Sequence, residues 1–141
     1  MEIPLSDIWV AAGFLIGLQA AAFTWRVSRE IAVSERGDIT WLPPADLLNL
    51  LAMLVAFLGV FVPPIVGLRT PNVPQVALGL SIVLFASYPF ALAGHYDLYV
   101  KGPRSYKYAT GQEVIAIAVA LLAATAYLLV SVIGQLFESF N

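Results

Sequence analysis

The chain has 141 residues, of which 60% are hydrophobic and only 11% charged, and its mean hydropathy is +0.86. A soluble domain is about one half apolar and about one quarter charged, so this composition excludes an ordinary soluble globular protein. The length suits a single domain, residues 1–141. The net charge of -2 gives no indication of a nucleic-acid partner, and the lack of cysteine excludes disulfides, thiolate metal sites and thiol catalysis.

Four apolar segments follow one another along the chain, and each approaches the roughly 20 residues that a helix needs to cross about 30 Å of hydrocarbon. None carries a charged residue away from its ends. The pattern predicts an all-α, polytopic integral membrane protein, a four-transmembrane-helix bundle with short loops. The predicted spans are residues 8–27, 45–62, 73–96 and 113–137.

Capping and breaking residues set the expected helix ends. Ser6 is placed to cap the first helix, which can continue past the bilayer as far as Arg36. The adjacent Pro63 and Pro64 are expected to end or kink the second span, because proline lacks the backbone N–H. Residues 110–113, Thr-Gly-Gln-Glu, fit a capping box that starts the fourth helix.

Basic residues are unevenly distributed between the connecting segments. Six lie in or beside the first and third loops, and one lies in the second loop: Arg26, Arg29, Arg36, Lys101, Arg104 and Lys107, against Arg69. Because cytoplasmic loops of membrane proteins carry an excess of Lys and Arg, this bias predicts how the expected multi-pass protein is oriented in the cell membrane. Loops 1 and 3 are expected in the cytoplasm, with the N-terminus and the C-terminus outside.

Small residues recur every four positions on two of the spans, and such stripes let helix backbones approach closely in lipid. The stripes comprise Gly13, Gly17 and Ala21 in the first span and Ala116, Ala120 and Ala124 in the fourth. One interpretation is packing within the bundle, and the other is a contact with a second copy or another membrane subunit. The two are compatible.

A candidate polar seam, Ser81, Tyr88 and His95, repeats every seven residues along the third span. The seam either lines a water-filled path or ligand site, or is purely structural. In the structural interpretation, which we favour, each hydroxyl bonds its own helix backbone and His95 lies at the headgroup level. Three other deep polar residues are each expected to bridge two helices: Gln19, Asn49 and Thr125.

The third loop combines basic and aromatic residues, which suit an anionic lipid surface or a docking patch for a cytoplasmic partner. Membrane lipids are the expected contact. The candidate residues are Lys101, Arg104, Tyr106 and Lys107.

No hydrolase, protease, phosphate-binding or dinucleotide-binding motif occurs in the sequence, and no cofactor or metal site is expected. The spans also lack a carboxylate away from their ends, which argues against an ion-coupled transporter. We therefore expect a non-enzymatic subunit of a larger homo- or hetero-oligomeric membrane assembly. One alternative is a self-assembling pore, or a membrane-perturbing effector or sensor, lined by the third span. The other is an enzyme that acts on a lipid or quinone through Tyr96, His95, Asp97 and the basic third loop.

Overall fold

The computed structural model describes residues 3–34, 42–68, 72–96, 98–99 and 109–139. Its elements are α1 (Leu5–Ser34), α2 (Pro44–Ala56), the π-helix η1 (Phe57–Phe61), α3 (Val62–Ile65), α4 (Val73–His95) and α5 (Gly111–Ser139). Four helical stretches are long and apolar enough to cross a membrane: Leu5–Ala32, Pro44–Ile65, Val73–His95 and Gly111–Phe137. The predicted fold class, an all-α bundle of four transmembrane helices, is confirmed.

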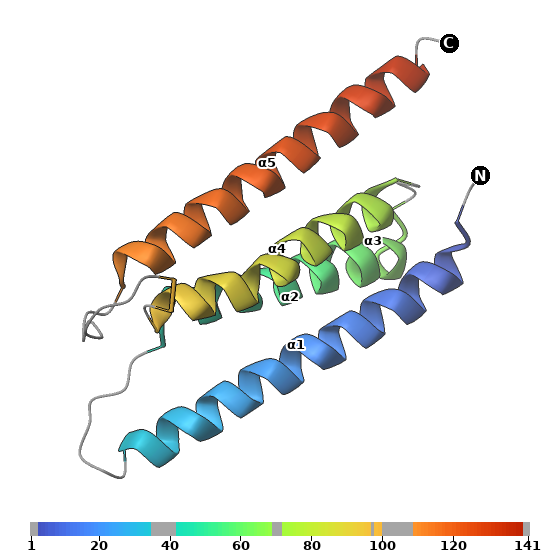
Figure 1. Cartoon of the computed structure of the whole chain (residues 1–141). Coiled ribbons are helices and arrows are strands. Elements are labelled where there is room, and N and C mark those ends of the chain that lie inside the picture. The colour runs from blue at the N-terminus through green and yellow to red at the C-terminus, as the bar shows by residue number, and fades with distance from the viewer. Residues whose placement is uncertain (1–2, 35–41, 69–71, 97, 100–108, 140–141) are drawn as a thin grey trace.

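Helices α2 and α4 form the centre of the bundle, with α5 packed on α4 and α1 packed on α2 (Figure 1). The starts of α2 and α5 and the ends of α1 and α4 meet at one end of the bundle, which we call the polar end for reasons given below. The start of α1 and the end of α5 lie at the opposite end (Figure 1). Consecutive spans therefore run antiparallel, as short connections require.

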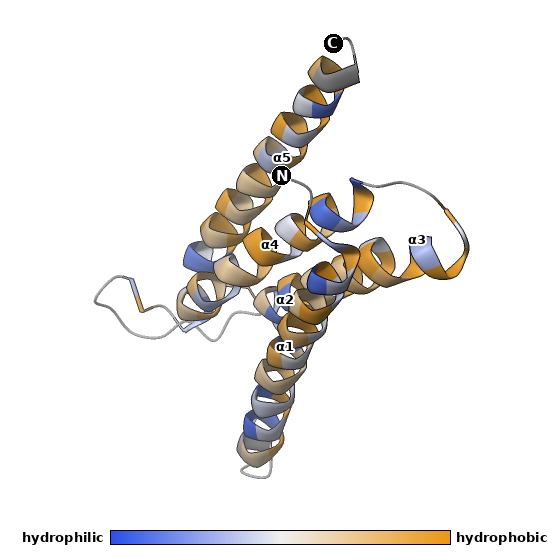
Figure 2. Ribbon diagram, turned by 90° about the vertical axis from the view of Figure 1, so that its right-hand side faces the viewer, coloured by the Kyte–Doolittle hydropathy of each residue, from blue (hydrophilic) through white to orange (hydrophobic). Residues whose placement is uncertain are grey.

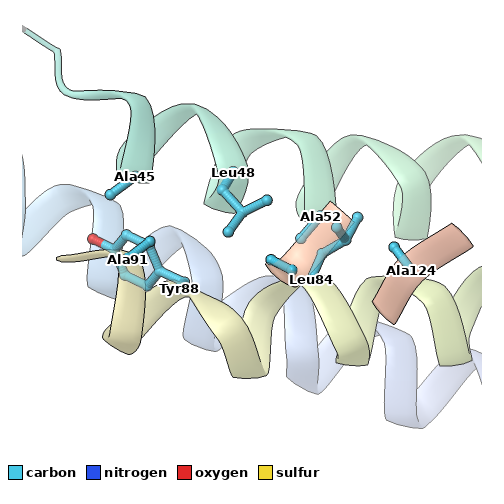
Figure 3. Close-up of a cluster of buried hydrophobic side chains, with 8 residues drawn as sticks. Ala45, Leu48, Ala52, Leu84, Tyr88, Ala91 and Ala124 are labelled. Atoms are coloured by element: carbon cyan, nitrogen blue, oxygen red, sulfur yellow. The ribbon is translucent and has the colours of Figure 1, made fainter. Parts of the chain in front are cut away.

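The main core lies between α2 and α4 and is built largely from alanine (Figure 3). Small side chains let these two helices approach closely, and dispersion forces then replace the hydrophobic drive that lipid removes. The buried members are Ala45, Leu48 and Ala52 of α2, Leu84, Tyr88 and Ala91 of α4, and Ala120 and Ala124 of α5. A second apolar cluster, Ile8, Ala12 and Val60, closes the bundle toward the N-terminal end of α1.

Figure 2 shows that apolar residues predominate along most of the length of the helices. Large hydrophobic side chains such as Val10, Phe14, Leu122 and Val130 are each at least 70% exposed. In water such a surface would be strongly unfavourable, whereas hydrocarbon solvates it. The outer helix faces therefore suit direct contact with membrane lipid.

The second span continues through its two prolines and ends at a glycine. Pro63 and Pro64 lie in α3, directly after the π-helical turn η1, so they coincide with an irregularity rather than a stop. The stop is Gly67, whose φ of +76° is a left-handed conformation that glycine adopts easily. Its N–H donates to the carbonyl of Pro64, and the N–H of Leu68 donates to the carbonyl of Pro63, as in a Schellman motif.

The predicted caps are correct in part. Ser6 is not the cap of α1, because the helix already begins at Leu5 and the Ser6 hydroxyl donates to the Asp7 carboxylate instead. Thr110 does cap α5, since its Oγ1 accepts the Glu113 N–H at 3.1 Å. The Glu113 carboxylate, however, bonds to other helices.

Candidate functional site

Helix α1 continues past the predicted span to Ser34, close to the expected limit at Arg36, and the burial of its first arginine is the unexpected feature. Arg26 and Arg29 are helical residues, not loop residues, and the Arg26 side chain is only 1% exposed. It points into the bundle on the same side of α1 as the buried Gln19, which lies seven residues earlier. Arg26 was counted among the basic residues in or beside the first loop, but its side chain is buried in the bundle and is not solvated.

The buried guanidinium of Arg26 is compensated by Asp46, near the start of α2. Arg26 Nε lies 3.3 Å from Asp46 Oδ2, and the Tyr88 hydroxyl donates to Asp46 Oδ1 at 2.9 Å. The Asp46 carboxylate thus connects three helices, α1, α2 and α4. An unpaired charge at this depth would be strongly unfavourable, so the ion pair is what allows both residues to be buried.

Tyr96, at the end of α4, lies beneath two guanidinium groups. Its hydroxyl accepts from Nη1 of Arg26 at 2.7 Å and also from Arg29, whose Cζ lies 4.8 Å from the ring centroid. Burial raises the pKa of Tyr96, and the positive charges of Arg26 and Arg29 partly offset this increase. Glu30 accepts from Arg26 and completes a charge-balanced group of two cations and two carboxylates, with Asp46.

His95 pairs with Glu113, a partner that sequence reasoning missed. His95 Nδ1 lies 3.0 Å from Glu113 Oε2, while Glu113 Oε1 accepts the backbone N–H of Ala45 at 2.8 Å. Glu113 is fully buried and joins the starts of α2 and α5 to the end of α4. The expected partner, Asp97, lies outside the described residues.

Farther from the polar end, polar side chains of three helices bond to one another. Gln19 Nε2 donates to Ser81 Oγ at 3.2 Å, and Ser81 Oγ donates to the Ala52 carbonyl at 2.7 Å. Asn49 Nδ2 donates to the Gln19 carbonyl at 3.0 Å. Gln19 and Asn49 bridge helices as predicted.

Two expectations about hydroxyl groups are wrong. Ser81 and Tyr88 bond to other helices, not to their own backbone, because the α4 face that carries them is turned into the bundle. Thr125, expected to bridge two helices, is exposed and donates to the Leu121 carbonyl of its own helix.

We call six of these residues the polar column, because they follow one another along the α1–α2–α4 interface. They are Gln19 and Arg26 of α1, Asp46 and Asn49 of α2, and Ser81 and Tyr88 of α4. The sequence held a signal for this set: Gln19 and Arg26 are seven residues apart, as are Ser81 and Tyr88, and residues so spaced share a helix face. Neither spacing identifies the partner helix.

The two small-residue stripes have different environments. Ala116, Ala120 and Ala124 pack into the main core. Gly13, Gly17 and Ala21 are exposed, and a Cβ added to either glycine would meet no atom within 4 Å. The four loop residues Lys101, Arg104, Tyr106 and Lys107 lie outside the described part of the chain.

Comparisons with protein-family models, curated proteins and solved structures find no match. Within the described ranges, no three His, Cys, Asp or Glu side chains gather as they would to hold a metal ion. The described residues of the site form an inter-helix ion pair, a His–Glu pair and hydrogen bonds of amides and hydroxyls.

Proposed function

We propose that the chain is a non-enzymatic membrane subunit that packs into a larger homo- or hetero-oligomeric assembly through α1. One observation carries the proposal. The stripe formed by Gly13, Gly17 and Ala21 is suited to close helix packing, yet it is exposed, while the comparable stripe of α5 is covered. A flat, small-residue face lets another helix approach closely, and van der Waals packing then drives association in lipid.

The orientation of α1 supports this assignment. Its buried residues Ile8, Ala12 and Gln19 face α2 and α4, and the stripe lies on the side of the helix turned away from them. A partner helix can thus pack on α1 without displacing anything in the bundle.

The contacts of the α4 seam favour a subunit over a pore lined by this helix. Ser81 and Tyr88 are buried and bonded to α2, and His95 is bonded to α5, so these groups act within one chain. The same contacts argue against the lipid- or quinone-acting enzyme, since the pairing of His95 with Glu113 joins helices.

The proposed setting is the cell membrane, with loops 1 and 3 in the cytoplasm and both termini outside. Arg26 no longer contributes to the charge bias, because Asp46 neutralises it inside the bundle. Five basic residues remain in or beside loops 1 and 3, and one lies in the second loop: Arg29, Arg36, Lys101, Arg104 and Lys107, against Arg69.

Native mass spectrometry from mild detergent tests the proposal. The wild-type chain is expected in a complex heavier than the monomer, and Gly17→Leu is expected to lose it, because the longer side chain holds the partner helix away. Leu18→Ala is the matched control: Leu18 is exposed at the same depth but lies about 100° around the helix from Gly17. A strictly monomeric wild type, or an unchanged mass for Gly17→Leu, would contradict the proposal.

A further inference from the structure

A groove with a volume of about 480 Å³ lies between α4 and α5 at the polar end of the bundle. Small, partly buried side chains form its floor: Ser87 of α4 and Ala116 of α5. Large apolar side chains, each at least 60% exposed, form its rims: Phe90 of α4, and Ile115 and Val119 of α5. The groove is therefore apolar and faces the hydrocarbon of the membrane.

The end of the groove nearest the start of α5 is polar, and hydrogen bonds hold it in place. Tyr99, which follows the end of α4, donates its backbone N–H to Gln112 Oε1 at 2.9 Å. Its hydroxyl donates to the Phe90 carbonyl at 2.5 Å, so the side chain is fixed along α4. The Gln112 oxygen is thus used within the chain, and its NH₂ group remains as a donor. An aromatic ring and an amide donor together suit the headgroup level of a membrane.

The groove reaches into the membrane without crossing it. Gln112 and Ala120 are eight residues apart on α5, which corresponds to about 12 Å along the helix. One leaflet contributes about half of the roughly 30 Å of hydrocarbon. Ala120 closes the inner end, because it packs into the main core, and no described residue of α5 beyond it lines the groove. A spanning helix of a partner would need a longer groove, whereas one acyl chain of the adjacent leaflet fits this length.

The charges near the polar end of the groove favour an anionic headgroup. Residues 100–110, which connect Tyr99 to α5, include three basic residues and no acidic one: Lys101, Arg104 and Lys107. The carboxylate of Glu113 is buried and pairs with His95, so it does not oppose an anion at the neighbouring Gln112. Basic residues next to a membrane surface attract anionic lipids. We propose that the α4–α5 groove binds one acyl chain of an anionic phospholipid, with the phosphate of the lipid at Gln112.

Native mass spectrometry of the full chain with two phospholipids tests the site. Protein in mild detergent is titrated with dioleoyl phosphatidylglycerol, which is anionic, and with dioleoyl phosphatidylcholine, which has the same acyl chains and no net charge. We expect one phosphatidylglycerol per chain to bind with a Kd about tenfold or more below that of phosphatidylcholine, because of the basic residues near the groove. Equal Kd values for the two lipids, or binding of many lipids without a tight first one, would overturn the proposal. No described residue of α1 lines the groove, so the result does not depend on the proposed α1 interface.

Two substitutions act on different parts of the groove. Ser87→Leu fills the floor and should raise the Kd for phosphatidylglycerol about tenfold, because its side chain takes the space of the acyl chain. Ala86→Leu is the matched control: Ala86 is exposed on the same helix but does not line the groove, so the Kd should stay unchanged. Gln112→Glu keeps an oxygen for the Tyr99 N–H but adds a negative charge, so it should weaken the binding of phosphatidylglycerol alone.

Thermal unfolding checks that each variant is folded, and Gln112→Glu keeps the test decisive if Ser87→Leu is not. Wild-type affinity for phosphatidylglycerol in both variants would overturn the proposal, as would an equal loss in Ala86→Leu and Ser87→Leu. If Ser87→Leu instead lowers the mass of a protein complex and leaves lipid binding unchanged, a partner helix occupies the groove and the proposal is wrong.

Discussion

Arg26 and Asp46 are charged side chains inside membrane-spanning helices, and each is tolerated there because of the other. The guanidinium of Arg26 also serves Glu30 and Tyr96, while the carboxylate of Asp46 also accepts from Tyr88. A change at one partner therefore leaves a charge exposed to a medium that cannot solvate it. The contributions of these side chains to the stability of the bundle therefore depend on one another.

Replacing one partner of the Arg26–Asp46 pair is expected to destabilise the bundle more than replacing both. Asp46→Leu leaves the guanidinium unpaired and should lower the free energy of unfolding by about 3–5 kcal/mol. The double variant Arg26→Met, Asp46→Leu removes both charges and should recover much of that loss. Unfolding by sodium dodecyl sulfate in mixed micelles measures the free energy of unfolding of the single and double variants. If the loss in the double variant equals the sum of the two single losses, the pair contributes no coupling.

The Ser81 hydroxyl is expected to contribute more to stability than the Thr125 hydroxyl. Ser81 bonds two other helices, so Ser81→Ala should cost about 0.6–1.7 kcal/mol, between the average and the largest value for hydrogen bonds between membrane helices. Thr125→Val removes an exposed hydroxyl that bonds only its own helix and should have little effect. The same detergent titration compares them, and equal losses would argue against the inter-helix role of Ser81.

At the scale of the helices, glycine has opposite roles in α1 and α4. Gly94 lies where α4 crosses the start of α5, and a Cβ there would come 2.7 Å from the Glu113 backbone nitrogen. Only a residue without a side chain allows the two helices to approach this closely. The same approach lets the Thr110 hydroxyl donate to the Gly94 carbonyl at 2.6 Å. Gly13 has open space around it.

Alanine at these two glycines is expected to have effects of opposite sign. Gly94→Ala forces backbone atoms of α4 and α5 apart and should destabilise the chain by about 1–3 kcal/mol, as overpacking does. Gly13→Ala gains helix propensity without a clash and should stabilise α1 by about 0.5–1 kcal/mol. Thermal unfolding of the monomer in detergent measures the stability of both variants. If Gly94→Ala leaves the stability unchanged, α4 and α5 are packed less closely at Gly94 than described.

At the scale of the whole molecule, the two ends of the bundle differ in chemistry. Ion pairs and hydrogen bonds join all four spans at the polar end, through Asp46, Tyr96 and Glu113. Apolar contacts around Val60 close the other end, where none of residues 125–137 of α5 is buried. The bundle is thus tied by polar contacts at one end and surrounded by lipid-facing apolar surface elsewhere.

The sequence alone determined the number and the approximate limits of the membrane spans. The fourth was predicted as residues 113–137 and is Gly111–Phe137, because apolar length and the cap at Thr110 are local properties that need no partner. The same local reasoning placed Ser81, Tyr88 and His95 on one helix face.

Only the tertiary structure decided what those faces contact. Helical periodicity places residues on a side of their own helix, but the partner depends on how the helices are rotated and paired in space. Arg26 was therefore counted with the basic residues of the first loop, whereas the structure buries its side chain next to Asp46. For the same reason the stripe at Gly17 and the stripe at Ala120 are alike in sequence, yet one is exposed and the other is buried.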